Sequence, residues 1–173
     1  MRPAVQADTI RCMALRVYVE TTVPSFLTAW PSGDLIRAAQ QHQTALWWAR
    51  RSEYELLGSE LLLAECAAGD ASAAEARLAA LTGLTLLEQG VEVAALASAL
   101  LRLVPLPERA LADATHIATA AVHGADLLVT WNCRHIANPV LRPRIEAVCR
   151  AAGYEPPAIC TPGELLGEES SDA

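Results

Sequence analysis

Short apolar runs alternate with longer segments of helical spacing along most of the chain. The apolar runs show little polar alternation and predict strands at residues 15–19, 54–59, 84–88, 126–130 and 158–160. The segments between them predict helices at residues 34–51, 60–69, 71–81, 92–104, 109–124 and the later part of 139–153. Strands of this kind, separated by helices, are typical of a parallel sheet covered on both faces. We therefore predict an α/β fold in three layers, a doubly wound parallel sheet flanked by helices.

The length of 173 residues suits one domain with a sizeable core, which we place at residues 15–167. We predict an N-terminal tail at 1–14, with Met13 as an alternative start, and an acidic C-terminal tail at 168–173. Charged residues break every apolar stretch before the ~18 residues that a membrane span needs. The first residues lack a continuous signal-peptide core, so we expect a cytoplasmic protein without membrane contact.

Cysteine and histidine spacing argues against several kinds of site. The five cysteines contain no CxxC pair, which disfavours a disulfide scaffold or a zinc knuckle and favours reduced, mostly buried thiols. The four histidines form no HExxH motif, so a zinc protease has no support. The first strand–helix junction, "VETTVPSF", has no glycine, and the chain has no GxSxG elbow. These absences argue against a nucleotide-binding loop and against an α/β-hydrolase.

Three acidic residues lie in apolar surroundings and need an explanation: Glu20, Glu65 and Asp113. Glu20 directly follows the strand predicted at 15–19, and Asn132 follows the strand predicted at 126–130. Ligands of open α/β sheets bind beyond the carboxyl ends of the strands, so both lie at the edge where a site is expected.

Each acid also has a structural explanation. Glu20 is a candidate helix cap, although Thr21 and Thr22 are better capping residues. Glu65 borders the apolar stripe of its helix, and Asp113 is an early-helix acid that the helix dipole favours. Taken together, the three acids favour a shared site over three separate explanations.

Carboxylates that share a partly buried site repel one another, and a divalent cation relieves that cost. Oxygen ligands select Mg²⁺ or Mn²⁺ over zinc. In a chain without cofactor motifs, a common use of such a metal is to activate water against a phosphodiester. We therefore expect Mg²⁺ or Mn²⁺ as the cofactor.

Three segments of the chain, in order from residue 15 onward, resemble the PIN-domain family and, within it, the VapC-like ribonuclease toxins. "VYVETTVPSF" resembles the opening strand of that family, with an acid followed by Thr or Ser, and "SELLLAEC" resembles the segment with the second acid. "LADATHIATAAVHGADLLVTWNCRHIANP" carries the third acid and is the strongest match. Two positions depart from the family pattern, because Glu20 stands where Asp is usual and Asn132 where an acid is frequent.

The resemblance implies a metal-dependent endoribonuclease that cleaves single-stranded RNA and belongs to a toxin–antitoxin pair. Glu20, Glu65 and Asp113 would hold the metal, and Asn132 would orient water or the ion. One or two metals remain alternatives. The resemblance also implies a homodimer and a protein antitoxin as partners. A catalytically weak RNA-binding or regulatory module of the same family remains the alternative function.

The net charge of −7 argues against nucleic-acid binding by the chain as a whole. Segment 134–150 differs, because its four arginines against one glutamate give it a net charge of +3. We expect Arg134, Arg142 and Arg144 to contact the RNA backbone, and Thr22 to bond to a ligand carboxylate or to the phosphate.

Three tryptophans have both a core and a functional interpretation. Trp131 is a candidate for stacking on a base, although a buried position is the better expectation. Trp47 and Trp48 are expected in the core or at a dimer interface.

Overall fold

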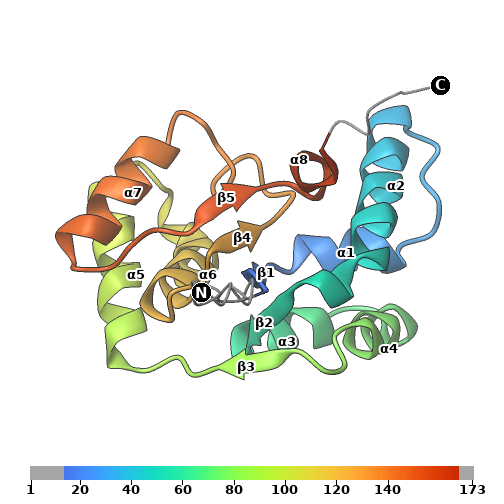
Figure 1. Cartoon of the computed structure of the whole chain (residues 1–173), viewed down its shortest axis with the longest axis horizontal. Coiled ribbons are helices and arrows are strands. Elements are labelled where there is room, and N and C mark those ends of the chain that lie inside the picture. The colour runs from blue at the N-terminus through green and yellow to red at the C-terminus, as the bar shows by residue number, and fades with distance from the viewer. Residues whose placement is uncertain (1–13, 168–173) are drawn as a thin grey trace, which may run out of the picture.

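The computed structural model describes residues 14–167. The predicted tail at 168–173, Met13 and nearly all of the predicted tail at 1–14 lie outside these residues. Within them, five parallel strands form one sheet in the order β3-β2-β1-β4-β5 (Figure 1). The strands are β1 (Arg16–Val19), β2 (Glu55–Ser59), β3 (Thr85–Leu87), β4 (Leu127–Val129) and β5 (Ala158–Cys160).

Eight α-helices flank the sheet in the described part of the chain, together with two short 3₁₀ helices, η1 (Arg51–Glu53) and η2 (Glu108–Ala110). The α-helices are α1 (Thr22–Thr28), α2 (Leu35–Ala49), α3 (Glu60–Ala67), α4 (Ala71–Ala80), α5 (Val91–Leu103), α6 (Leu111–Val122), α7 (Arg142–Ala151) and α8 (Pro162–Leu166). The predicted α/β fold, a parallel sheet with helices on its faces, is confirmed.

β1 lies at the centre of the sheet and is paired on both sides. Tyr18 is in register with Leu57 of β2 and with Leu128 of β4. Val17, Tyr18 and Val19 are all fully buried. An apolar run without polar alternation is what a strand covered on both faces requires, and this is why residues 16–19 form the central strand.

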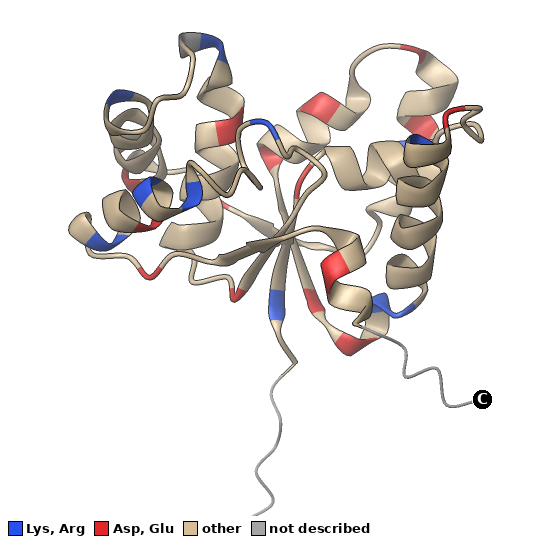
Figure 2. Ribbon diagram, turned by 90° about the horizontal axis from the view of Figure 1, so that it is seen from above, with Lys and Arg blue, Asp and Glu red and all other residues tan. Residues whose placement is uncertain are grey.

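The two faces of the sheet carry separate apolar clusters. On one face, Tyr18 and Leu128 pack with side chains from α5, α6 and α7. On the other face, Val17, Val19 and Val129 pack with side chains from α1, α2 and α3. Figure 2 shows this layering, with the strands between two groups of helices.

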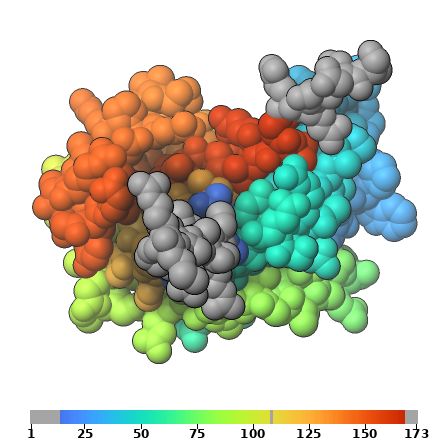
Figure 3. Space-filling model, in the orientation of Figure 1, coloured from blue at the N-terminus to red at the C-terminus, as the bar shows by residue number. Residues whose placement is uncertain are grey.

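A capping bond at its N-terminus and packing against a later helix fix α2 in place. The Asp34 side chain accepts a hydrogen bond from the backbone N–H of Arg37 at 2.8 Å and so caps the helix predicted at 34–51. α2 also packs against α8 (Figure 3, cyan and red).

Two short helices, α1 and α8, were not predicted. α1 contains Pro24, which a helix tolerates only in its first turn, and its "TTVP" start has poor helix propensity. α8 has five residues and begins with Pro162, and Thr161 and Glu164 form a capping box at its N-terminus. Their lengths are below what periodicity can detect, since a helical pattern needs about 11 residues to be read.

The cysteines in residues 14–167 are unpaired, as expected. Cys66 and Cys149 are buried, and burial raises the pKa of both thiols to about 11, so they stay protonated near neutral pH. No helix among the described residues is long and apolar enough to cross a membrane.

Candidate functional site

Glu20 stands at the carboxyl end of the central strand β1 and is only 4% exposed. Its Oε2 atom accepts three hydrogen bonds: from the Thr22 N–H at 3.0 Å, the Thr22 hydroxyl at 2.5 Å and the Thr130 hydroxyl at 2.7 Å. These bonds satisfy the buried charge and fix the side chain. None of the described residues bonds to Oε1, so that oxygen can bind a ligand.

Glu65 reaches the same place from α3. Its Oε2 atom accepts a hydrogen bond from the Thr21 hydroxyl and lies 2.9 Å from Nε2 of His116. Burial favours a higher pKa for the Glu65 carboxyl, but the hydrogen bonds from His116 and Thr21 outweigh it and lower the pKa below its ordinary value. Glu65 is therefore ionised at neutral pH.

His116 on α6 links Glu65 to a polar chain inside the core. Its Nδ1 atom lies 2.8 Å from the hydroxyl of Tyr18, which in turn lies 2.7 Å from the hydroxyl of Ser59. When Nε2 carries the proton, His116 donates to Glu65 and accepts from Tyr18. When Nδ1 carries the proton, His116 donates to Tyr18, and the Nε2 lone pair can bind a metal. The first arrangement satisfies the imidazole by hydrogen bonds alone, and the second does so when Nε2 binds an ion.

Glu20, Glu65 and His116 form a group that can hold a metal ion. Each offers one ligand atom, and these atoms all lie within 4.8 Å of one another. Two carboxylates and one neutral imidazole are a donor set that suits a divalent cation. The predicted cluster of carboxylates at the sheet edge is thus present for Glu20 and Glu65, with His116 as the third member.

Asp113 belongs to a neighbouring cluster and not to that group of three. Its Oδ1 atom accepts a hydrogen bond from the Asn132 side-chain amide at 2.9 Å, and its Oδ2 atom lies 2.7 Å from Nδ1 of His135. The Asn132 backbone N–H donates to the hydroxyl of Thr130 at 2.8 Å, and that hydroxyl donates to Glu20. Asp113 and Asn132 are therefore brought together, and a chain of hydrogen bonds connects them to Glu20.

The residues predicted to contact RNA lie in three different environments. Thr22 is at the site itself, bonded to Glu20. Arg134 and Arg144 are exposed, whereas Arg142 is half-buried and its Nε atom lacks a hydrogen-bond partner among the described residues. Arg142 is therefore less available to an RNA backbone than the other two arginines.

The structure also shows the positions of the three tryptophans for which core and functional interpretations were given. Trp47 is fully buried and Trp48 is nearly so, as expected for core residues. Trp131 is half-buried, and its Nε1 donates to the Thr44 hydroxyl at 2.7 Å.

Sequence reasoning missed His116 and His135. His116 lies three positions after Asp113 on α6, on the same side of that helix. A histidine in the apolar run "ATHIATAA" needs a hydrogen-bonding partner when it is buried. That need could have identified His116 as a candidate site residue.

No protein-family model matches the chain. A search of curated proteins likewise finds no significant match.

Proposed function

We propose that the chain is a metal-dependent endoribonuclease that hydrolyses single-stranded RNA. The observation that carries the proposal is the meeting of Glu20, Glu65 and His116 within 4.8 Å at the carboxyl edge of a parallel sheet. The resemblance of three chain segments to the PIN-domain family supports it independently. Under this proposal the chain is a VapC-like toxin, with a protein antitoxin and a second copy of itself as partners.

Glu20, Glu65 and His116 would hold Mg²⁺ or Mn²⁺ through two carboxylate oxygens and Nε2. When bound, the ion activates water for attack on the phosphodiester and offsets charge on a phosphate oxygen. Thr22 and Thr130 keep the Glu20 carboxylate in one orientation, and Thr21 does the same for Glu65.

Asp113 would act beside that centre as a proton acceptor. Asn132 and His135 each bond to a different oxygen of its carboxylate, which leaves a lone pair on each oxygen for a water molecule. In this position Asp113 accepts a proton as water attacks phosphorus.

A second candidate function is RNA binding with little cleavage. It is favoured by the hydrogen bonds that the acids already accept within the fold, because Glu20 accepts three bonds on Oε2 and each Asp113 oxygen has one partner. In that case these hydrogen bonds stabilise the fold and no ion is needed.

Cleavage of end-labelled single-stranded RNA in Mn²⁺, Mg²⁺ or EDTA separates the two functions. We expect cleavage that requires the metal and falls by at least two orders of magnitude in Glu65→Gln and Asp113→Asn. Glu53→Gln is the matched control, because Glu53 is exposed and its one ion pair within residues 14–167 is with Arg50 at 3.1 Å. Equal cleavage by all four proteins, or RNA binding without cleavage, would contradict a nuclease that uses this site.

A further inference from the structure

A cavity of about 460 Å³ opens beside the two carboxylates. It is lined by Glu20, Thr21, Thr22, Ser25, Phe26, Arg37, Glu65 and Ala68. Its volume lies in the range of small-ligand sites. Among these lining residues, Arg37 is the only basic one.

Arg37 reaches the cavity from the first turn of α2 and lies against an aromatic ring. Its guanidinium carbon is 5.2 Å from the centroid of the Phe26 ring on α1. The Asp34 carboxylate accepts from the backbone N–H of Arg37. Within residues 14–167 the Arg37 guanidinium forms no ion pair.

The Phe26 ring is itself held in place. It contacts the ring of Trp131 at a centroid distance of 5.9 Å and an angle of 32°. Trp131 is anchored at two points, since its backbone N–H donates to the Thr22 hydroxyl and its Nε1 donates to Thr44. Arg37, Phe26 and Trp131 therefore form a continuous row, and Trp131 at its end bonds to Thr22, which in turn bonds to Glu20.

This arrangement leaves the guanidinium ready to bind an anion. A cation over a ring face is stabilised by the ring without using its N–H donors. The five N–H groups of an arginine fit a phosphate with two parallel hydrogen bonds. A phosphodiester that approaches two carboxylates is repelled by them, and a cation at the same cavity offsets that repulsion.

We propose that Arg37, positioned by Phe26, binds a phosphate of the RNA substrate next to the reacting one. The inference rests on the proposed function and names a residue of the same site that contacts the substrate. It differs from the expectation for segment 134–150, because Arg134, Arg142 and Arg144 do not line this cavity.

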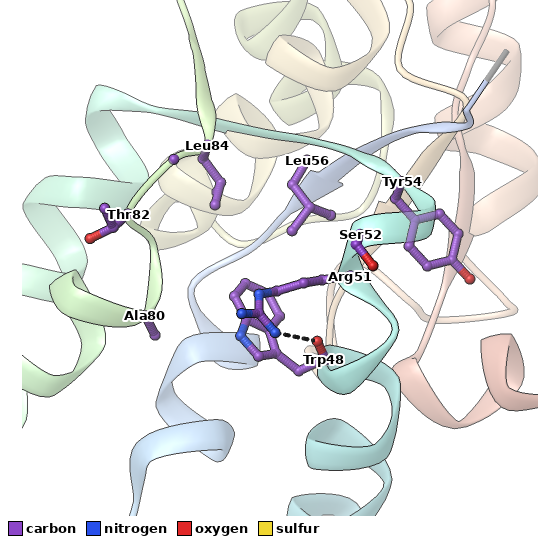
Figure 4. A pocket seen from close by; sticks show the side chains of 9 residues that line it. Trp48, Arg51, Ser52, Tyr54, Leu56, Ala80, Thr82 and Leu84 are labelled. Carbon is purple, nitrogen blue, oxygen red and sulfur yellow. Dashed lines mark hydrogen bonds between the residues drawn. The ribbon is translucent and has the colours of Figure 1, made fainter.

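The chain offers a matched control in Arg51. Its guanidinium carbon also lies over an aromatic ring, 5.9 Å from the centroid of Trp48, and its Nη1 donates to the Trp48 carbonyl at 3.1 Å (Figure 4). That pair belongs to another cavity, of about 330 Å³, near the amino ends of β2 and β3. No carboxylate is among the residues lining it, so an Arg51 variant tests loss of a similar arginine away from the site.

The experiment compares Arg37→Ala, Arg37→Lys, Phe26→Leu and Arg51→Ala with the unchanged protein. Binding of a labelled single-stranded RNA of about 12 nucleotides is measured in EDTA by fluorescence anisotropy across a salt series. The kcat and KM for cleavage are measured in Mn²⁺, and Mn²⁺ affinity is measured without RNA by electron paramagnetic resonance.

We expect Arg37→Ala to weaken RNA binding and raise KM by roughly tenfold or more, because a charge-assisted contact is lost. The salt slope should fall by about 0.7, the value for one phosphate of a single strand. Lysine should restore part of the affinity, Phe26→Leu should give an intermediate loss, and Arg51→Ala should match the unchanged protein. Mn²⁺ affinity should not fall in Arg37→Ala.

The two proposals fail in different ways. Cleavage by the unchanged protein, with Arg37→Ala and Arg51→Ala indistinguishable, overturns the role of Arg37 and leaves the nuclease standing. RNA binding that depends on Arg37 without any cleavage overturns the nuclease and leaves the phosphate contact standing. Absence of RNA binding overturns both proposals. If Mn²⁺ affinity falls in Arg37→Ala by as much as KM rises, Arg37 belongs to the metal site and does not bind the phosphate.

Discussion

Glu65 shows how two neighbouring donors decide the charge of a half-buried acid. His116 and Thr21 both bond to the same oxygen, Oε2, and together they lower the pKa of the carboxyl against the effect of burial. A folded-state pKa below the ordinary value of 4.5 means that ionised Glu65 stabilises the fold above that pH. This contribution is lost as the pH falls through the folded-state pKa.

Thr21→Val removes one of those donors at nearly constant shape. We expect the pKa of Glu65 to rise, so that its stabilising contribution disappears at a higher pH than in the unchanged protein. A carboxyl-detected NMR titration of the metal-free protein measures this. Thr28→Val is the control, since the Thr28 hydroxyl bonds to the Pro24 carbonyl on the same helix α1. Identical Glu65 titration in both variants would show that the Thr21 bond does not control the charge.

Tyr18 holds a polar chain inside an otherwise apolar cluster. Burial raises its pKa, so the hydroxyl keeps its proton and can donate. Tyr18→Phe leaves His116 Nδ1 and the Ser59 hydroxyl without this partner, and we expect a loss of about 1–3 kcal/mol in the free energy of unfolding. Urea unfolding followed by tryptophan fluorescence measures the loss. Tyr154→Phe is the control for loss of a tyrosine hydroxyl, and a loss in Tyr18→Phe no larger than in this control would contradict the role of the buried polar chain.

The acids that meet at the sheet edge were predictable, but not every partner was. Glu20 and Glu65 stood out because they follow or interrupt apolar runs. His116 did not stand out, because its role depends on Tyr18 and Ser59, which are distant in sequence and meet it only in the fold. Sequence patterns identify residues that need partners, and tertiary packing decides which partners they receive.

At the scale of elements, the short helices are the part of the fold that the sequence did not predict. α1 supplies Thr22 and Phe26 to the site, and its seven residues gave no periodic signal. The long, strongly patterned elements were predicted to within a few residues, because burial of a regular face produces a regular sequence. Local caps and short turns depend instead on a few specific bonds.

α8 depends on one such set of bonds. The Thr161 hydroxyl accepts from the Glu164 N–H, and the Glu164 side chain accepts from the Thr161 N–H. We expect Thr161→Ala to cost about 1 kcal/mol of stability and to speed hydrogen exchange in α8. Ser98→Ala, on the exposed side of α5, should cost less, because its hydroxyl bonds only within the helix. Slow exchange in α8 of the Thr161 variant would contradict the role of the cap.

At the scale of the whole molecule, the arginines are unevenly distributed. Arg102 lies on α5 and Arg142, Arg144 and Arg150 lie on α7, and Figure 2 shows blue ribbon segments gathered on that side of the sheet, although the chain as a whole is acidic. The fold was predictable at this scale, because buried strands alternating with helices have few other solutions. The arrangement of surface charge was not predictable, because it depends on which exposed residues lie on the same face of the folded molecule.

Substitution of both Arg134 and Arg144 by alanine tests the basic segment as a contact surface for RNA. Both side chains are exposed, and we expect weaker RNA binding with a salt slope reduced by roughly 0.7 for each lost phosphate contact. Arg102→Ala on α5 is the control for a change in overall charge. An unchanged salt slope in the double variant would remove segment 134–150 from the RNA-binding surface.

The central position of β1 has a consequence for the newly made protein. Glu20 is translated early, but the hydroxyl that holds its carboxylate belongs to Thr130, 110 positions later. β1 also lacks one of its two neighbouring strands until β4 has been made. Pairing over such a separation is slow and comes late in folding. A nascent chain on the ribosome therefore carries Glu20 without its Thr130 partner until the 110 positions between them have been translated, and the centre is assembled only after β4 has emerged.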